Sequence, residues 1–176
     1  MKNISLKRII VTGAIFMIIA GSLLHFTYEW SGGNQLVALF SAASESVWEH
    51  SKLFLLPLAI MAVIEYIKVR DLARVLWTVL VQLVFMVGFI TVFFYTYTGA
   101  FGFENVIIDI SSFIVAVVLG QMVALHMLKS KSKPLVNKYL SAAALVAIFF
   151  MFAVFTFNPP ALPIFTQHDP AVQAKQ

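Results

Sequence analysis

The stretch SESVWEHSK, residues 44–52, concentrates acids, a histidine and a lysine within a few positions. Glu45, Glu49 and His50 offer carboxylate oxygens and imidazole nitrogens, which can bind a divalent metal or move a proton. Lys52 adds a positive charge one helical turn after Glu49. On a helix His50 points about 100° away from Glu49, so a site that contains His50 needs partners from elsewhere in the chain.

Two residues far from this stretch in the sequence, His25 and Asp109, offer the same kinds of donor atom, an imidazole nitrogen and a carboxylate oxygen. His25 lies at the end of a long apolar run, and Asp109 stands in NVIIDISSF at the start of another. Two histidines and a carboxylate at one depth form a donor set used in many zinc sites, so His25, His50 and Asp109 are the predicted metal ligands. An acid in an apolar segment usually faces a partner inside the protein, and Lys52 is an alternative partner for Asp109.

The same stretch also has a purely structural interpretation. Ser46 and Glu49 have the spacing of a capping box, which satisfies backbone N–H groups at a helix start. On a helix Glu45, Glu49 and Lys52 would lie on one face, so Lys52 would neutralise Glu49 or Glu45. Trp48 is typical of the aromatic belt at a membrane interface. In this interpretation the polar residues position a helix and bind no ligand.

The composition of the chain is that of a protein in lipid. Of 176 residues, 61% are hydrophobic and only 11% are charged, and the mean hydropathy is +0.92. A soluble domain of this size could not bury so much apolar surface, so the lipid bilayer is the expected partner. The sequence contains no cysteine, which excludes disulfides and thiolate metal sites.

Five apolar stretches approach the ~20 residues that a membrane-spanning helix requires. We therefore predict an all-α, polytopic membrane helix bundle, with a single transmembrane domain over residues 1–176. The predicted spans cover residues 9–26, 46–67, 72–95, 106–128 and 139–157. The second reaches this length only if it begins inside SESVWEHSK, and Pro57 within it predicts a kink. The Pro-rich tail, residues 158–176, is predicted to be extended.

The first apolar run has an alternative interpretation as a cleaved signal peptide. Basic residues precede it, and Ala20-Gly21-Ser22 resembles a weak cleavage site. The run is long for a signal core and continues past that site, which favours a retained span.

The basic residues predict the orientation. Ten of the twelve fall before the first span, between the second and third, or between the fourth and fifth: Lys2, Lys7, Arg8, Lys68, Arg70, Arg74, Lys129, Lys131, Lys133 and Lys138. The positive-inside rule then makes the N-terminus cytoplasmic and the C-terminus external, in the cell (cytoplasmic) membrane. The net charge of +4 is thereby a topology signal, and no nucleic-acid partner is predicted. The acids and histidines of SESVWEHSK, His25 and Asp109 all fall near the outer boundary.

Four segments together resemble a known family: HFTYEW at 25–30, SESVWEHSKLFLLP at 44–57, DISSF at 109–113 and PPALPIF at 159–165. They are similar to a family of small, uncharacterised prokaryotic integral membrane proteins with an outer signature close to Asn-Glu-Ser-x-Trp-Glu-His-x-Lys. Ser44 stands where that signature has asparagine. The resemblance implies a multi-pass membrane protein and brings no established activity.

Three functions fit this pattern. The first is a binding or transport-type membrane protein whose outer polar site binds a divalent metal such as zinc, or a small polar ligand. Its candidate residues are His25, Glu45, Glu49, His50, Lys52 and Asp109. The second is an intramembrane metal-dependent hydrolase, with Glu49 as general base. The third is a structural or accessory membrane protein. No nucleotide loop or nucleophile motif favours an enzyme, so the first is preferred; protein partners and oligomeric state are left open.

Overall fold

The computed structural model describes residues 5–167, and this part of the chain is all-α. Its helices, in chain order, are α1 Leu6–Trp30, α2 Gln35–Ala38, α3 Val47–Lys52, α4 Leu55–Val69, α5 Leu72–Phe101, α6 Val106–Lys129, α7 Lys138–Phe157 and the 3₁₀ turn η1 Pro163–Phe165. The prediction of an all-α fold is confirmed.

Polar caps determine where the long helices begin. Ser5, Asp71, Asn105 and Asn137 precede α1, α5, α6 and α7, and each side chain accepts a hydrogen bond from a backbone N–H of the first turn. These bonds satisfy groups that a helix start leaves unpaired, which is costly in an apolar chain. Gly102 ends α5 with a φ of 72°, a left-handed conformation that glycine adopts without strain. Short polar segments thus separate long apolar helices.

Four of the predicted spans correspond to helices that are long and apolar enough to cross a membrane: α1, α5, α6 and α7. The stretch predicted as a fifth span, residues 46–67, is instead divided into α3 and α4, with a break at Leu53 and Phe54. Pro57 explains the break, because it lacks the N–H that would bond to the carbonyl of Leu53. The predicted kink is therefore present, one turn before the proline.

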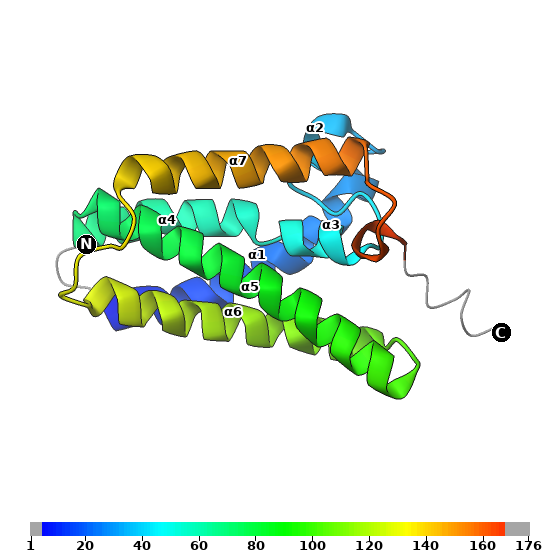
Figure 1. The fold of residues 1–176 in the computed structure, drawn as a ribbon, viewed down its shortest axis with the longest axis horizontal. Helices are drawn as coiled ribbons and strands as arrows, with labels where there is room; N and C mark the ends of the chain where they lie inside the picture. Colours follow the sequence, from blue (N-terminus) through cyan, green and yellow to red (C-terminus); the bar gives the residue numbers. More distant parts are fainter. Residues whose placement is uncertain (1–4, 168–176) are drawn as a thin grey trace.

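The five longer helices lie side by side, while α2, α3 and η1 gather at one end of the bundle (Figure 1). Helix α5 packs against α4, α6 and α7, and α1 packs against α4 and α6. We call the end with α3 the histidine end, because His25 and His50 lie there. The opposite end, where α4 ends at Lys68–Val69 and α5 begins, is the basic end.

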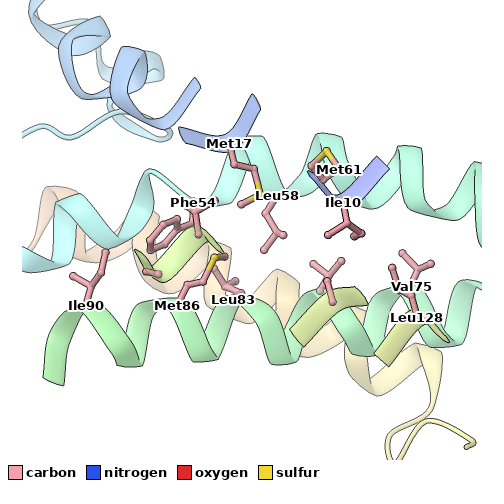
Figure 2. Close-up of a cluster of buried hydrophobic side chains, with 14 of the residues drawn as sticks. Ile10, Met17, Phe54, Leu58, Met61, Val75, Leu83, Met86, Ile90 and Leu128 are labelled. Atoms are coloured by element: carbon pink, nitrogen blue, oxygen red, sulfur yellow. The ribbon is translucent and has the colours of Figure 1, made fainter. Parts of the chain in front are cut away.

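The interior between α1, α4, α5 and α6 is filled by aliphatic, aromatic and methionine side chains (Figure 2). Two glycines permit close helix packing. A Cβ on Gly13 of α1 would overlap the Met61 side chain of α4, and one on Gly120 of α6 would lie 2.7 Å from Met86 of α5. Outside this core, large apolar residues such as Ile15, Val92 and Val154 remain more than half exposed. Such an apolar exterior suits lipid contact.

Candidate metal and ligand site

Ser41 joins the end of α1 to the segment that leads into α3. Its hydroxyl donates to the carbonyl of Leu24 and accepts from the backbone N–H of Tyr28 at 2.9 Å, and its side chain is fully buried. Leu24 and Tyr28 flank His25 on α1. The connection therefore fixes the histidine of α1 beside the start of α3.

Ser46 then begins α3 as predicted, because its hydroxyl accepts from the backbone N–H of Glu49 at 3.3 Å. The reciprocal half of the predicted capping box is replaced by another bond: the Glu49 carboxylate accepts from the N–H of Ala43 at 2.8 Å. This cap places Glu45 just before the helix and His50 within its first turn.

His25, His50 and Glu45 converge at this end of the bundle. The two histidine Nε2 atoms lie 3.0 Å apart, and Glu45 Oε2 lies 3.4 Å from Nε2 of His50 and 3.6 Å from Nε2 of His25. The three donor atoms thus form a compact triangle that could hold a metal ion. The sequence predicted that the two histidines meet, and the structure brings them together; the carboxylate nearest to them belongs to Glu45.

The hydrogen bond of His50 to the backbone determines which of its ring nitrogens is available. His50 Nδ1 lies 2.8 Å from the carbonyl oxygen of Ser46, which can only accept, so Nδ1 carries the proton. In the neutral ring Nε2 then presents a lone pair to the triangle. A carbonyl that orients a histidine in this way is the usual outer support of a metal ligand. His25 Nδ1 is buried without a hydrogen-bond partner among residues 5–167.

Glu45 supplies the negative charge of the triangle. Hydrogen bonds and charge interactions with His25 and His50 hold the pKa of the Glu45 carboxyl well below its usual range, despite partial burial. The carboxylate therefore stays ionised through the range in which histidines titrate. It can serve as an anionic metal ligand at neutral pH and as an ion-pair partner when the histidines are protonated.

A cavity of about 380 Å³ adjoins the triangle, and His25, Glu45 and His50 lie in its wall. The rest of its wall is largely apolar, with side chains from α1, α5 and α6 that include Phe26, Phe94 and Phe113. Asp109 is also in the wall, and its Oδ1 accepts a hydrogen bond from the Tyr97 hydroxyl at 2.6 Å. Asp109 thus shares a cavity with the histidines, while the close donor group is made by Glu45.

Glu49 and Lys52 form a separate, buried ion pair on another side of α3. Lys52 Nζ lies 2.6 Å from Glu49 Oε2, and it also donates to the Ala38 carbonyl at 2.6 Å and to Thr156 Oγ1 at 2.7 Å. Thr156 donates in turn to Glu49 Oε1 at 2.7 Å. This network ties α2, α3 and α7 together. The predicted neutralisation of Glu49 by Lys52 is confirmed. The alternative prediction, that Lys52 pairs with Asp109, is wrong, because Lys52 bonds to Glu49, Thr156 and the Ala38 carbonyl.

Trp48 lies beside this network. Its side chain is 7% exposed and contacts Phe152, Phe155 and Phe165, with ring centroids 4.3, 5.5 and 5.0 Å away. The prediction that Trp48 anchors the chain in the membrane interface is wrong, because the ring is enclosed between α7 and η1. The Pro-rich segment therefore returns to the bundle through Phe165. Its part after residue 167 lies outside the described residues.

Sequence reasoning missed three polar residues that build this end of the bundle: Ser41, Tyr97 and Thr156. Each lies in or beside an apolar run, where a hydroxyl is too common to indicate a partner. The hydroxyls of Ser41 and Thr156 connect elements 13 to 107 residues apart in the chain. Only the three-dimensional arrangement identifies them.

The fold and the site together define a class: a multi-pass helical membrane protein with four candidate spans and a His/Glu/His group that could hold a metal. The chain belongs to a family of unknown function, DUF6512, whose model matches residues 1–171. Comparison with curated proteins and with solved structures finds no match. The family assignment agrees with the predicted resemblance to a family that has no established activity.

Proposed function

We propose that this protein binds a divalent transition metal, with zinc as the first ion to test, at His25, Glu45 and His50. The distances within the donor triangle support this proposal. Zinc bonds of ~2.0–2.1 Å at tetrahedral angles require donor atoms about 3.3 Å apart. The three observed separations are 3.0, 3.4 and 3.6 Å, so an ion fits with shifts of only a few tenths of an ångström.

The proposed site faces the outside of the cytoplasmic membrane. Two arguments support this topology. Residues Val47–Val69, which include α3, the break and α4, would together rise about 34 Å and could form a fifth span. The basic residues collect at the opposite end of the bundle, which the positive-inside rule makes cytoplasmic. An odd number of spans then leaves the C-terminus outside.

Three protein ligands leave a coordination position for water or a ligand. The apolar cavity beside the triangle would receive the remainder of that ligand. We therefore infer a binding function in which the metal holds a polar group and the cavity holds an apolar one. Asp109, fixed by Tyr97, would approach the polar group from the cavity wall.

An intramembrane metal-dependent hydrolase is the second candidate function, and the cavity is the observation that favours it. A bound metal can polarise a carbonyl or lower the pKa of its water, and a nearby carboxylate can accept a proton. Asp109 is better placed for that role than Glu49, since Glu49 is held by Lys52, Thr156 and the Ala43 N–H. A fluorogenic acyl ester offered to zinc-loaded protein tests this candidate. Turnover lost in Asp109→Asn, with zinc binding retained, is the expected result for an enzyme.

The metal proposal itself is tested by metal content and zinc calorimetry on protein purified in mild detergent without chelator. We expect near-stoichiometric zinc in the wild type and its loss in His50→Ala and Glu45→Ala. His126→Ala is the matched control, because His126 is exposed on α6 at the basic end and should leave binding unchanged. Equal zinc uptake by the wild type and His50→Ala, both folded, would overturn the proposal and leave a structural role for the cluster.

A further inference from the structure

Glu65 is an ionisable group inside the bundle and far from the histidines. It lies on α4, four residues before the helix ends at Val69, and it is 0% exposed. Neither carboxylate oxygen has a hydrogen-bond partner among residues 5–167. Buried side chains of this kind are normally paired, so Glu65 requires a physical explanation.

Other polar side chains near this end of the interior also lack partners among the described residues. They are Thr78 and Gln82 of α5 and Ser141 of α7, and each is 0% exposed. Counted from the basic ends of their helices at ~1.5 Å per residue, Glu65, Thr78 and Ser141 lie about 5–9 Å deep. Glu65, Thr78 and Ser141 thus share a similar depth, and we call them the polar layer of the basic half; Gln82 lies deeper, at about 15 Å, beside Gly120 of α6.

This layer is distinct from the candidate metal site. Gly13 of α1 lies against Met61 of α4, which puts those two residues at one depth. His25 follows Gly13 by about 18 Å of helix rise, and Glu65 lies about 6 Å from Met61 in the opposite direction. The two groups are thus separated by about 24 Å along the bundle, with the methionine-rich core of Figure 2 between them.

An ionised carboxylate in this position would cost several kcal/mol without a cation beside it. The buried faces of the helices that pack on α4 contain no titratable side chain: Ile9, Ile10, Gly13, Met17 and Gly21 of α1, and Val75, Thr78, Val79 and Gln82 at the basic half of α5. The nearest charged residues along the chain are Lys68, Asp71 and Arg74. Arg74 is engaged by Asp71 at 3.3 Å and by the carbonyl of Ser130.

We propose that Glu65 is an intramembrane proton-binding site, in which the buried carboxyl group is held in its neutral, protonated form. A proton fits better than a metal ion here. Metal ions such as Ca²⁺ take six or more oxygens, but α4, α5 and α7 are unbroken at this depth and their carbonyls stay within the helices. Intramembrane carboxyls of this type are used in proton relays.

Infrared spectroscopy of the protein in lipid vesicles tests this proposal without requiring access to the group. The wild-type minus Glu65→Gln difference spectrum should contain the C=O band of a protonated carboxyl near neutral pH. We expect that band to vanish at alkaline pH and to be unaffected by replacing choline with sodium. Glu29→Gln is the matched control, because Glu29 is exposed and ionised carboxylates give no such band. Glu65→Gln should bind zinc as the wild type does, which separates this site from the metal proposal.

Two results would overturn the inference. A carboxylate band of Glu65 near neutral pH, independent of sodium, would mean that the group is ionised and paired. A carboxylate band that appears only with sodium would identify a sodium site instead. As a second measurement, dicyclohexylcarbodiimide, which is lipid-soluble and reacts with protonated carboxyls, should modify the peptide that contains Glu65 and not the one that contains Glu29. Modification of the Glu29 peptide, with or without that of the Glu65 peptide, would contradict a selectively protonated Glu65.

Discussion

Replacing Lys52 by methionine should strongly destabilise the protein. Lys52 is 0% exposed and Glu49 is 3% exposed, and the ammonium group donates three hydrogen bonds of 2.6–2.7 Å. Methionine fills a similar volume but leaves the Glu49 carboxylate in the interior without its cation. Removing one partner of a buried pair typically costs about 3–5 kcal/mol. We therefore expect Lys52→Met to lower the free energy of unfolding by that amount.

The assay is equilibrium unfolding in mixed detergent micelles, followed by circular dichroism. Lys129→Met is the control, because Lys129 is exposed at the end of α6 and its loss should change stability by less than about 0.5 kcal/mol. The double variant Glu49→Gln/Lys52→Met should be more stable than Lys52→Met alone, because it leaves no uncompensated charge. A loss below about 1 kcal/mol in Lys52→Met, as for an exposed pair, would refute this reasoning.

The same variant separates a structural from a ligand-binding role of the pair. Glu49 and Lys52 were predicted as candidate ligands, yet they bond to each other, to Thr156 and to backbone groups. If the pair only stabilises α3, folded Lys52→Met still binds one zinc ion with wild-type affinity. Zinc binding lost in protein that remains folded would instead make the pair part of the site.

Three further outcomes are expected. Zinc affinity, measured by calorimetry, should fall as the pH drops through the range in which histidines titrate, because protons compete with the metal for Nε2. Hydrogen bonds with His25 and His50 lower the pKa of Glu45, so the carboxylate keeps its charge throughout this drop. A midpoint in the ordinary carboxyl range would contradict the assignment. Tyr97→Phe should lower the free energy of unfolding by about 1–3 kcal/mol, because the hydrogen bond to Asp109 is lost. Tyr139→Phe is the control, since the Tyr139 ring is exposed. An equal decrease in the free energy of unfolding for the two variants would argue against that hydrogen bond. Gly120→Val should cost about 1–3 kcal/mol because its side chain would displace Met86, whereas Gly99→Val, with open space around it, should not share that steric cost.

The sequence predicted most of the fold because lipid imposes a simple rule on helix length. Four apolar runs became α1, α5, α6 and α7, each with ends within a few residues of those expected except at the histidine end of α5. The fifth run did not become one helix. Its hydropathy is similar, but Pro57 removes a backbone donor and the preceding turn opens at Leu53 and Phe54. Composition predicts immersion in lipid, whereas single backbone groups decide where a helix breaks.

The site was only partly predictable, because depth in the membrane can be read from a sequence and rotation about a helix axis often cannot. Depth placed His25, His50 and Asp109 near one boundary, and all three do line one cavity. Glu45 was expected on the same helical face as Glu49, but it precedes the cap at Ser46 and so escapes the helical periodicity. Its position is determined by the turn before α3. That turn in turn depends on the bonds of Ser41 to α1.

SESVWEHSK contains so many charged residues because the two sides of one short helix, α3, contact different polar groups. Successive residues of α3 differ by about 100°, so Glu49 and His50 must face different neighbours. Glu49, with Lys52 one turn later, meets α2 and α7 and is neutralised in the interior. His50 meets His25 of α1 and Glu45 at the wall of the cavity. The buried ion pair pins α3 against α7, and the Ser46 carbonyl orients the His50 ring, so one short helix serves both the interior and a three-ligand site whose donors come from two separate segments.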